Sequence, residues 1–172
     1  MGRSQMDVME AIRDRRSIRR YESKLIPEDK LQQILEAGRW APSASNRQPW
    51  KFVVVRDQRV KNELARVAVY GGFLSEAPVG IAVVIDPRGS THPVEDGAAA
   101  TQNMLLAAHA LGLGTCWIGS YGSGYEERAK EVLGIPHDRR LLSLISVGYP
   151  AESPRSTRMD IGKIVYYDRY TY

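Results

Sequence analysis

Two short segments hold the side chains best suited to binding an anionic, planar ligand. In the first, residues 13–20 read R-D-R-R-S-I-R-R, so that Arg15, Arg16 and Arg19 surround Ser17. Guanidinium groups bind phosphate oxygens through forked, charge-assisted hydrogen bonds, and a hydroxyl can add another. The sequence contains neither the glycine-rich dinucleotide fingerprint nor the Walker loop. A bound phosphate would therefore be held mostly by side chains.

The second segment, residues 41–50, reads A-P-S-A-S-N-R-Q-P-W. Pro42 and Pro49 bracket small hydroxyl and amide residues directly before a predicted strand. Such a loop is rigid, and it can present backbone groups and short polar side chains to the edge of a planar ligand. A plain connection between a helix and a strand would have a similar composition, so composition alone leaves both interpretations open.

Other kinds of site find little support in the sequence. His92, His109 and His137 are far apart, and none has a second ligand at metal-binding spacing, so we predict no metal site. Cys116 is the only cysteine, which excludes an intrachain disulfide and favours a reducing compartment. We expect its side chain to be a small buried hydrophobic group rather than a nucleophile.

Helical and strand patterns alternate along the 172 residues. Helices are predicted over residues 8–12, from residue 27, with Pro27 in the first turn, to about residue 38, and over residues 60–69, 94–111 and 126–133. Strands are predicted over residues 50–55, 79–85, 115–118 and 141–147. We therefore expect one domain over residues 1–172, an α+β sandwich in which helices flank a central mixed sheet.

The overall composition is that of a globular protein, with 43% hydrophobic and 26% charged residues. The longest apolar stretch, residues 104–113, is too short to span a bilayer, and residues 1–5 contain no apolar signal core. We expect a cytoplasmic protein that does not bind membranes.

The net charge of +4 comes largely from residues 13–20. These cations could bind a phosphorylated small molecule or a nucleic acid, or could form a solvated helix end. The run has no interleaved aromatic residues, and the chain has no recognition-helix or single-strand-binding motif, so we do not expect a nucleic-acid partner.

Four motifs together resemble the nitroreductase family of FMN-dependent NAD(P)H oxidoreductases. They are R-R-S-I-R, A-P-S-A-S-N-R-Q-P-W, G-L-G-T-C-W-I-G and R-M-D-I-G-K-I-V-Y-Y-D-R-Y, and they occur in the order typical of the family. The resemblance spans nearly the whole chain. Each motif alone is weak, but four in order are specific.

The resemblance implies a site assembled from two subunits of a homodimer. Three residues, Arg15, Arg16 and Ser17, match those that hold the FMN phosphate and ribityl chain. Arg19 matches a cation near the pyrimidine ring of the flavin. Arg158 matches a cation that completes the phosphate site. Pro42, Ser43 and Ala44, with Asn46 nearby, match a loop reaching the flavin of the other subunit. Trp117, Ile118 and Gly119 match the stretch beside the reactive edge, where a backbone N–H reaches N5. The tail, residues 164–172, would wrap around the partner.

The function implied is hydride transfer from NADH or NADPH through flavin N5 to nitroaromatic, quinone or related small-molecule acceptors by a ping-pong mechanism. The cofactor performs the chemistry, so we predict no catalytic side chain. Residues 70–78 are brief and offer only Gly71, Gly72 and Phe73 as a lid, which favours an open pocket. The alternatives are a flavin-binding carrier or sensor without turnover, or a nucleic-acid-binding module that uses residues 13–20.

Overall fold

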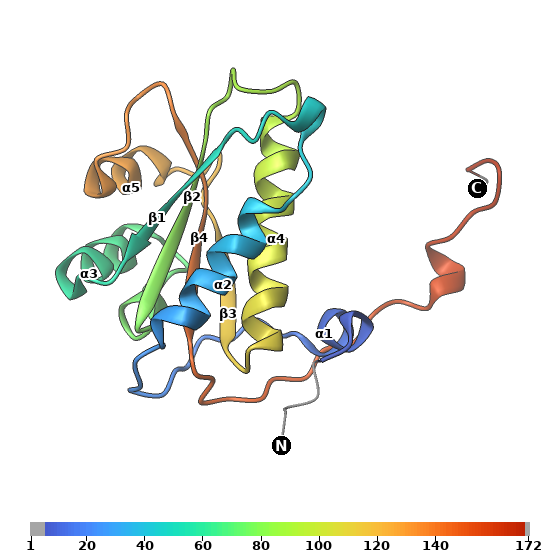
Figure 1. The fold of residues 1–172 in the computed structure, drawn as a ribbon, viewed down its shortest axis with the longest axis horizontal. Coiled ribbons are helices and arrows are strands. Elements are labelled where there is room, and N and C mark those ends of the chain that lie inside the picture. Colours follow the sequence, from blue (N-terminus) through green and yellow to red (C-terminus); the bar gives the residue numbers. More distant parts are fainter. Residues whose placement is uncertain (1–5, 171–172) are drawn as a thin grey trace.

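The architecture is built on a four-stranded sheet, seen in a computed structural model that describes residues 6–170 (Figure 1). The strands are β1 (Trp50–Val55), β2 (Val79–Ile85), β3 (Gly114–Gly119) and β4 (Arg140–Gly148). They lie in the order β1-β2-β4-β3 and pair antiparallel throughout. The predicted α+β class is confirmed, but the sheet formed by these strands is antiparallel rather than mixed. A connection that contains a helix can return the chain to either end of a sheet, so alternation alone does not determine strand direction.

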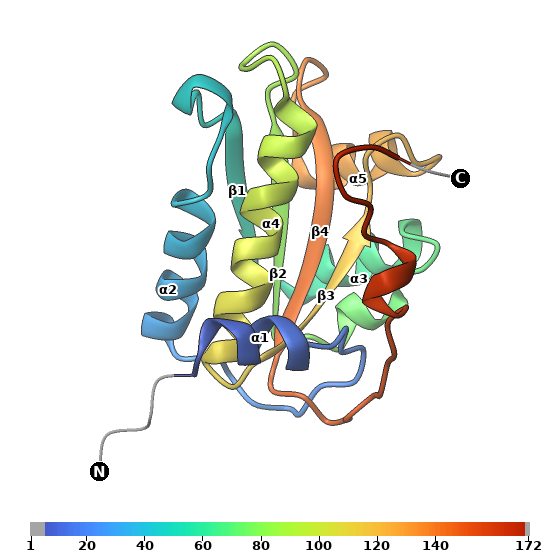
Figure 2. The same cartoon turned by 90° about the vertical axis from the view of Figure 1, so that its right-hand side faces the viewer.

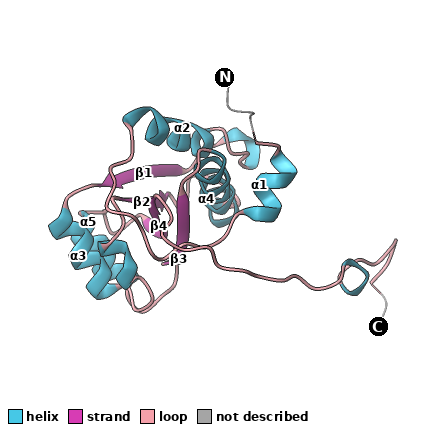
Figure 3. Ribbon diagram, turned by 90° about the horizontal axis from the view of Figure 1, so that it is seen from below, coloured by secondary structure: helices cyan, strands magenta, loops and turns pink. Residues whose placement is uncertain are grey.

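Helices cover both faces of this sheet. They are α1 (Val8–Asp14), α2 (Glu28–Arg39), α3 (Gln58–Val67), α4 (Pro93–Ala110) and α5 (Glu126–Leu133), with short 3₁₀ helices at Ala44–Asn46, Gly72–Ser75 and Ile161–Lys163. One face packs against α2 and α4 and the other against α3 and α5, while α1 lies beside the C-terminal end of α4 (Figures 2 and 3). Local signals explain the bounds: the Asp57 carboxylate caps α3, and Gly134 ends α5 in a left-handed conformation with φ 65°.

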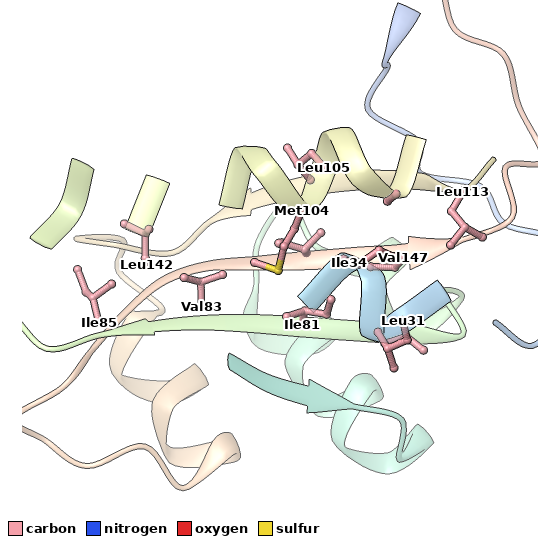
Figure 4. Packing of buried hydrophobic residues seen from close by; sticks show 13 residues of the cluster. Leu31, Ile34, Ile81, Val83, Ile85, Met104, Leu105, Leu113, Leu142 and Val147 are labelled. Atoms are coloured by element: carbon pink, nitrogen blue, oxygen red, sulfur yellow. The ribbon is translucent and has the colours of Figure 1, made fainter. Parts of the chain in front are cut away.

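Two hydrophobic clusters hold the layers together. Between the sheet and α2 and α4, Leu31, Ile34 and Met104 pack against side chains of β2 and β4 (Figure 4). Every residue of β2 is buried, as its uninterrupted apolar sequence predicts for a strand covered on both faces. On the other face, Leu64 and Ala129 belong to the second cluster. These clusters fix α4 and β3, the two elements that position the candidate site.

The C-terminal segment leaves the sandwich after β4 and extends away from it (Figures 1 and 3). Its large apolar side chains have little to pack against: Met159, Ile161 and Tyr167 are 69%, 70% and 85% exposed. Thr171 and Tyr172, which belong to the predicted docking tail, and residues 1–5 lie outside the described residues. No helix in the described part of the chain combines the length and apolar character needed to cross a membrane.

Candidate cofactor site

The basic segment after α1 lies along the outer edge of β3. Ser17 forms a parallel bridge with Thr115, and the Ile18 N–H donates to the Thr115 carbonyl at 2.9 Å. Farther along, the Ala151 N–H donates to the Arg20 carbonyl at 2.9 Å. The N-terminal segment is thus held against both β3 and the chain that follows β4.

Cations from both ends of the chain gather at this edge. Burial lowers the pKa of the Arg15 guanidinium, and the nearby positive charges of Arg158 and Arg16 lower it further, although Cys116 acts in the opposite direction. Burial raises the pKa of the Cys116 thiol, while Arg19, a hydrogen bond with Ser17, and Arg15 oppose that shift. Arg15, Ser17 and Arg19 therefore lie near the same buried thiol, and Arg158 lies within electrostatic reach of Arg15.

This cluster contains more positive charge than its surroundings neutralise. Among residues 6–170, no carboxylate forms an ion pair with Arg15, Arg19 or Arg158. Glu152, an acid of this region, accepts the backbone N–H groups of Arg19 and Arg20 instead. Such a cluster is suited to a phosphate or another anion.

Arg16 differs from its neighbours. Its Nη1 donates to the Arg13 carbonyl at 2.6 Å and the Arg15 carbonyl at 2.9 Å, so its guanidinium binds the C-terminal end of α1. Arg16 and Arg15 both line a small cavity of about 160 Å³, to which His109 and Thr115 also contribute. Side chains alternate between the two sides of an extended segment, which separates Arg16 from Ser17. The structure therefore brings together Arg15, Ser17, Arg19 and Arg158, whereas the Arg16 guanidinium is engaged with the helix end.

The end of β3 offers backbone amides beside these cations. The Thr115 carbonyl faces outward, because it accepts from Ile18 rather than from β4. Peptide groups two residues apart in a strand point the same way, so the N–H groups of Trp117 and Gly119 also face the open edge. Ile118, which lies between them, is 4% exposed and packs in the core. Any N–H contact from this stretch would come from Trp117 or Gly119.

The segment between α3 and β2 approaches the same region. The Arg19 guanidinium lies 5.8 Å from the centroid of the Phe73 ring, within cation–π range. Lys61 holds this segment: it is 4% exposed, and its ammonium donates to the Ala77 carbonyl at 2.6 Å. Phe73, the aromatic residue of the possible lid, is partly buried and packs against the second hydrophobic cluster.

The proline-bracketed loop lies at the other end of α4. The Ala44 N–H donates to the carboxylate of Asp96, in the first turn of that helix, whereas His109, in its last turn, lines the cavity near Arg15. A helix of 18 residues spans roughly 27 Å, and the two regions lie correspondingly far apart (Figure 2). Within one chain, this loop therefore does not meet the basic cluster, by which we mean Arg15, Ser17, Arg19 and Arg158. The separation applies to the predicted loop residues Pro42, Ser43, Ala44 and Asn46.

This loop has an unusual backbone that its sequence did not indicate. Ser45, Asn46 and Gln48 have φ angles of 52°, 54° and 50°, a left-handed region that residues other than glycine rarely adopt. The Ser43 hydroxyl accepts the Gln48 N–H at 2.9 Å and thereby closes the loop. Strained backbone of this kind concentrates at functional sites.

Another cavity, of about 460 Å³, lies elsewhere. It opens between the edge strand β1 and the end of α5, with Val53, Leu133 and Ile135 on its apolar wall and Arg47 and Lys51 among its cations. It includes no residue of the basic cluster. As for metals, residues 6–170 contain no group of three His, Cys, Asp or Glu side chains that could hold an ion.

Known proteins resemble this chain in both sequence and overall structure. A family model described as the nitroreductase family matches residues 12–70 and 65–149. A candidate NADH dehydrogenase/NAD(P)H nitroreductase from Methanothermobacter thermautotrophicus is 42% identical over 155 residues, covering 88% of this chain and 81% of the relative. The crystal structure of a candidate nitroreductase from Desulfovibrio desulfuricans in complex with FMN aligns with a TM-score of 0.86 at 34% identity, over 98% of this chain and 100% of that chain. The NADPH:FMN oxidoreductase of Vibrio harveyi complexed with NAD⁺ has a TM-score of 0.85 at 27% identity, over 96% and 78% of the two chains.

Proposed function

Because the chain belongs to the nitroreductase family, we propose that this FMN-dependent oxidoreductase passes a hydride from NADH or NADPH to nitroaromatic, quinone or related conjugated acceptors by a ping-pong mechanism. The observation that carries the proposal is the gathering of cations from both ends of the chain, Arg15, Arg19 and Arg158, beside outward-facing amides of β3. When bound, FMN would supply the group that accepts a hydride from the nicotinamide and passes reducing equivalents to the acceptor.

The residues of the cluster match the chemical needs of that cofactor. Arg15 and Arg158 would hold the phosphate, and the partial burial of Arg15 strengthens its interaction with an anion because less water screens it. Ser17 would donate to the phosphate or the ribityl chain. Arg19 adds positive charge, which favours the more negative, two-electron-reduced state of the cofactor. Backbone N–H groups at Trp117 or Gly119 would orient the ring.

We propose that a second copy of the chain completes the site. The loop at residues 42–46 lies about a helix length from its own basic cluster, so it can contribute to a flavin site only in another subunit. The exposed C-terminal tail provides a means of association, since its apolar side chains can be buried on a partner. Among the described residues, 6–170, nothing pairs with the outer edge of β1, and cavities of about 460 and 410 Å³ flank it, so this edge is the receptor that we favour for the tail.

Purified protein tests the cofactor and the reductant separately. We expect a yellow protein that releases FMN on heating, is bleached anaerobically by NADH or NADPH, and is reoxidised by a quinone or nitroaromatic compound. A colourless protein that fails to bind added FMN would refute the proposal. Flavin that stays oxidised with both nucleotides would favour a carrier or sensor, and salt-sensitive binding of the flavin-loaded protein to DNA or RNA would revive a nucleic-acid role.

Removing the tail tests the dimer. We expect a chain that ends at Met159 to sediment as a monomer and to lose bound FMN, because the deletion removes the docking segment while leaving Arg158 in place. Sedimentation velocity and the ratio of flavin to protein absorbance measure the two effects. Replacing Tyr166 and Tyr167 by serine in the full chain should weaken the dimer less, since the backbone can still pair. A truncated protein that remains dimeric and yellow would contradict tail exchange.

A further inference from the structure

Asp96 is a buried carboxylate whose partners all lie outside its own helix. It is 6% exposed and belongs to the first turn of α4. Its Oδ1 accepts the Ala44 N–H at 2.9 Å, and its Oδ2 accepts the hydroxyl of Ser90. The Ser90 oxygen in turn accepts the His92 N–H at 2.9 Å. One carboxylate thus connects the loop at residues 42–46 to the start of α4.

Support of the helix end explains only the Oδ2 contact and not the bond from Oδ1 to the loop. An acid in the first turn interacts favourably with the helix dipole, but the neighbouring Glu95 supplies that effect while remaining exposed. Burial of a carboxylate is unfavourable unless hydrogen bonds compensate for the lost water. Of the two carboxylate oxygens, Oδ2 acts on the start of α4 through Ser90, whereas Oδ1 binds the loop backbone.

The bond is placed where the loop needs a fixed point. Ala44 directly precedes the left-handed residues Ser45 and Asn46, and the Asn46 N–H donates to the Ser43 carbonyl at 2.9 Å. Those bonds close the loop on itself but do not attach it to the body of the protein. Asp96 supplies a hydrogen-bonded attachment in the middle of the loop: it ties residue 44 to α4, on which Ala41, at the start of the loop, also packs through Ala100.

We propose that Asp96 is the positioning residue of this loop, fixing Pro42, Ser43 and Ala44 so that they close the flavin site of the partner subunit. The inference rests on the proposed function. Asp96 acts through the Ala44 N–H and does not itself touch the cofactor.

Single substitutions test the bond. Asp96→Ala removes the acceptor and should weaken FMN binding about tenfold, whereas Asp96→Asn retains an oxygen for the Ala44 N–H and should restore most of the affinity. Thr101→Ala is the matched control, because Thr101 is a fully buried polar residue of the same helix whose hydroxyl bonds Gly97 and Ser143 instead of the loop. We expect the control to lower the unfolding midpoint of the apoprotein while leaving FMN affinity within about twofold of wild type.

Mixed dimers test whether the effect crosses the interface. We would purify a dimer of one Arg15→Ala chain and one Asp96→Ala chain through two different tags. If the loop acts on the partner's site, both substitutions affect the same site and the other site is unaltered. We expect half of the wild-type content of tightly bound FMN, with wild-type affinity. If Asp96 served its own chain's site, each site would carry one lesion and no tight site would return. General destabilisation predicts no such recovery either.

The outcomes separate the inference from the function on which it rests. A wild-type protein that binds no FMN refutes the proposed function. If wild type binds FMN, then equal effects of Asp96→Ala and Thr101→Ala, or no tight site in the mixed dimer, would overturn only the role of Asp96. Should Asp96→Ala not fold, Asp96→Leu, which fills similar space without an acceptor, takes its place. Failure of both to fold would make Asp96 a folding residue and would also overturn the inference.

Discussion

Arg15→Ala is expected to weaken FMN binding by roughly 10- to 100-fold. Hydrogen bonds to charged groups contribute about 1.5–3 kcal/mol, and each 1.4 kcal/mol corresponds to a factor of ten in affinity. Arg15 is the cation of the cluster that is partly buried, so water screens it less than its exposed neighbours. Its loss would also leave Arg158 without its companion at the proposed phosphate site.

Quenching of FMN fluorescence on titration with apoprotein measures this affinity. Arg59→Ala is the matched control, because it removes the same charge from an exposed position on α3, away from β3. We expect the control to bind FMN within about twofold of wild type, and Arg158→Ala to fall between the two. Equal losses for Arg15→Ala and Arg59→Ala would mean that net charge, and not a phosphate site, determines affinity.

Elements whose signals lie within a few residues of one another could be predicted from the sequence. The strands over residues 50–55 and 79–85 and the helix over residues 126–133 have the predicted bounds, and the lone cysteine is buried as expected. Helix α3 begins two residues earlier than predicted, at Gln58. Its start follows from the Asp57 side chain, which accepts the N–H groups of Arg59 and Val60.

Features that depend on tertiary partners could not be predicted in this way. The direction of each strand follows from how the connecting helices pack, which no local pattern records. Arg16 and Ser17 are neighbours with similar polar character, yet Arg16 binds the end of α1 while Ser17 lies beside Cys116. In the sequence, Asp96 looks like any acidic residue in the first turn of a helix. Only folding brings the Ala44 N–H to its carboxylate. The resemblance to a family indicated which segments matter but not how they are held.

The largest expected effect on stability follows from Glu126→Ala. Glu126 is 3% exposed and accepts from Arg140 Nε and Nη2, both at 2.7 Å, and from the N–H groups of Gly122 and Leu141 at 2.7 and 3.1 Å. Removing the carboxylate leaves the N–H groups of Gly122 and Leu141 without their acceptor, and it leaves Arg140, whose side chain is 33% exposed, without its ion pair, so we expect a loss of about 2–3 kcal/mol. Urea unfolding should detect this loss, while Glu131→Ala, at an exposed position of the same helix, should change the free energy of unfolding by less than about 0.5 kcal/mol.

The pH dependence of the free energy of unfolding shows whether the ion pair between Glu126 and Arg140 causes this loss of stability. Burial raises the pKa of Glu126, but the hydrogen bonds from Arg140, Gly122 and Leu141 together outweigh burial and hold that pKa below its usual value. A carboxylate with a depressed pKa in the folded state stabilises the protein above its unfolded pKa, about 4.3, and this stabilisation disappears as the pH falls through the folded value. Glu126→Gln should therefore be less stable than wild type at pH 7, and the difference should shrink below about pH 4. A difference that stays constant from pH 7 to pH 3 would attribute the effect to packing rather than to charge.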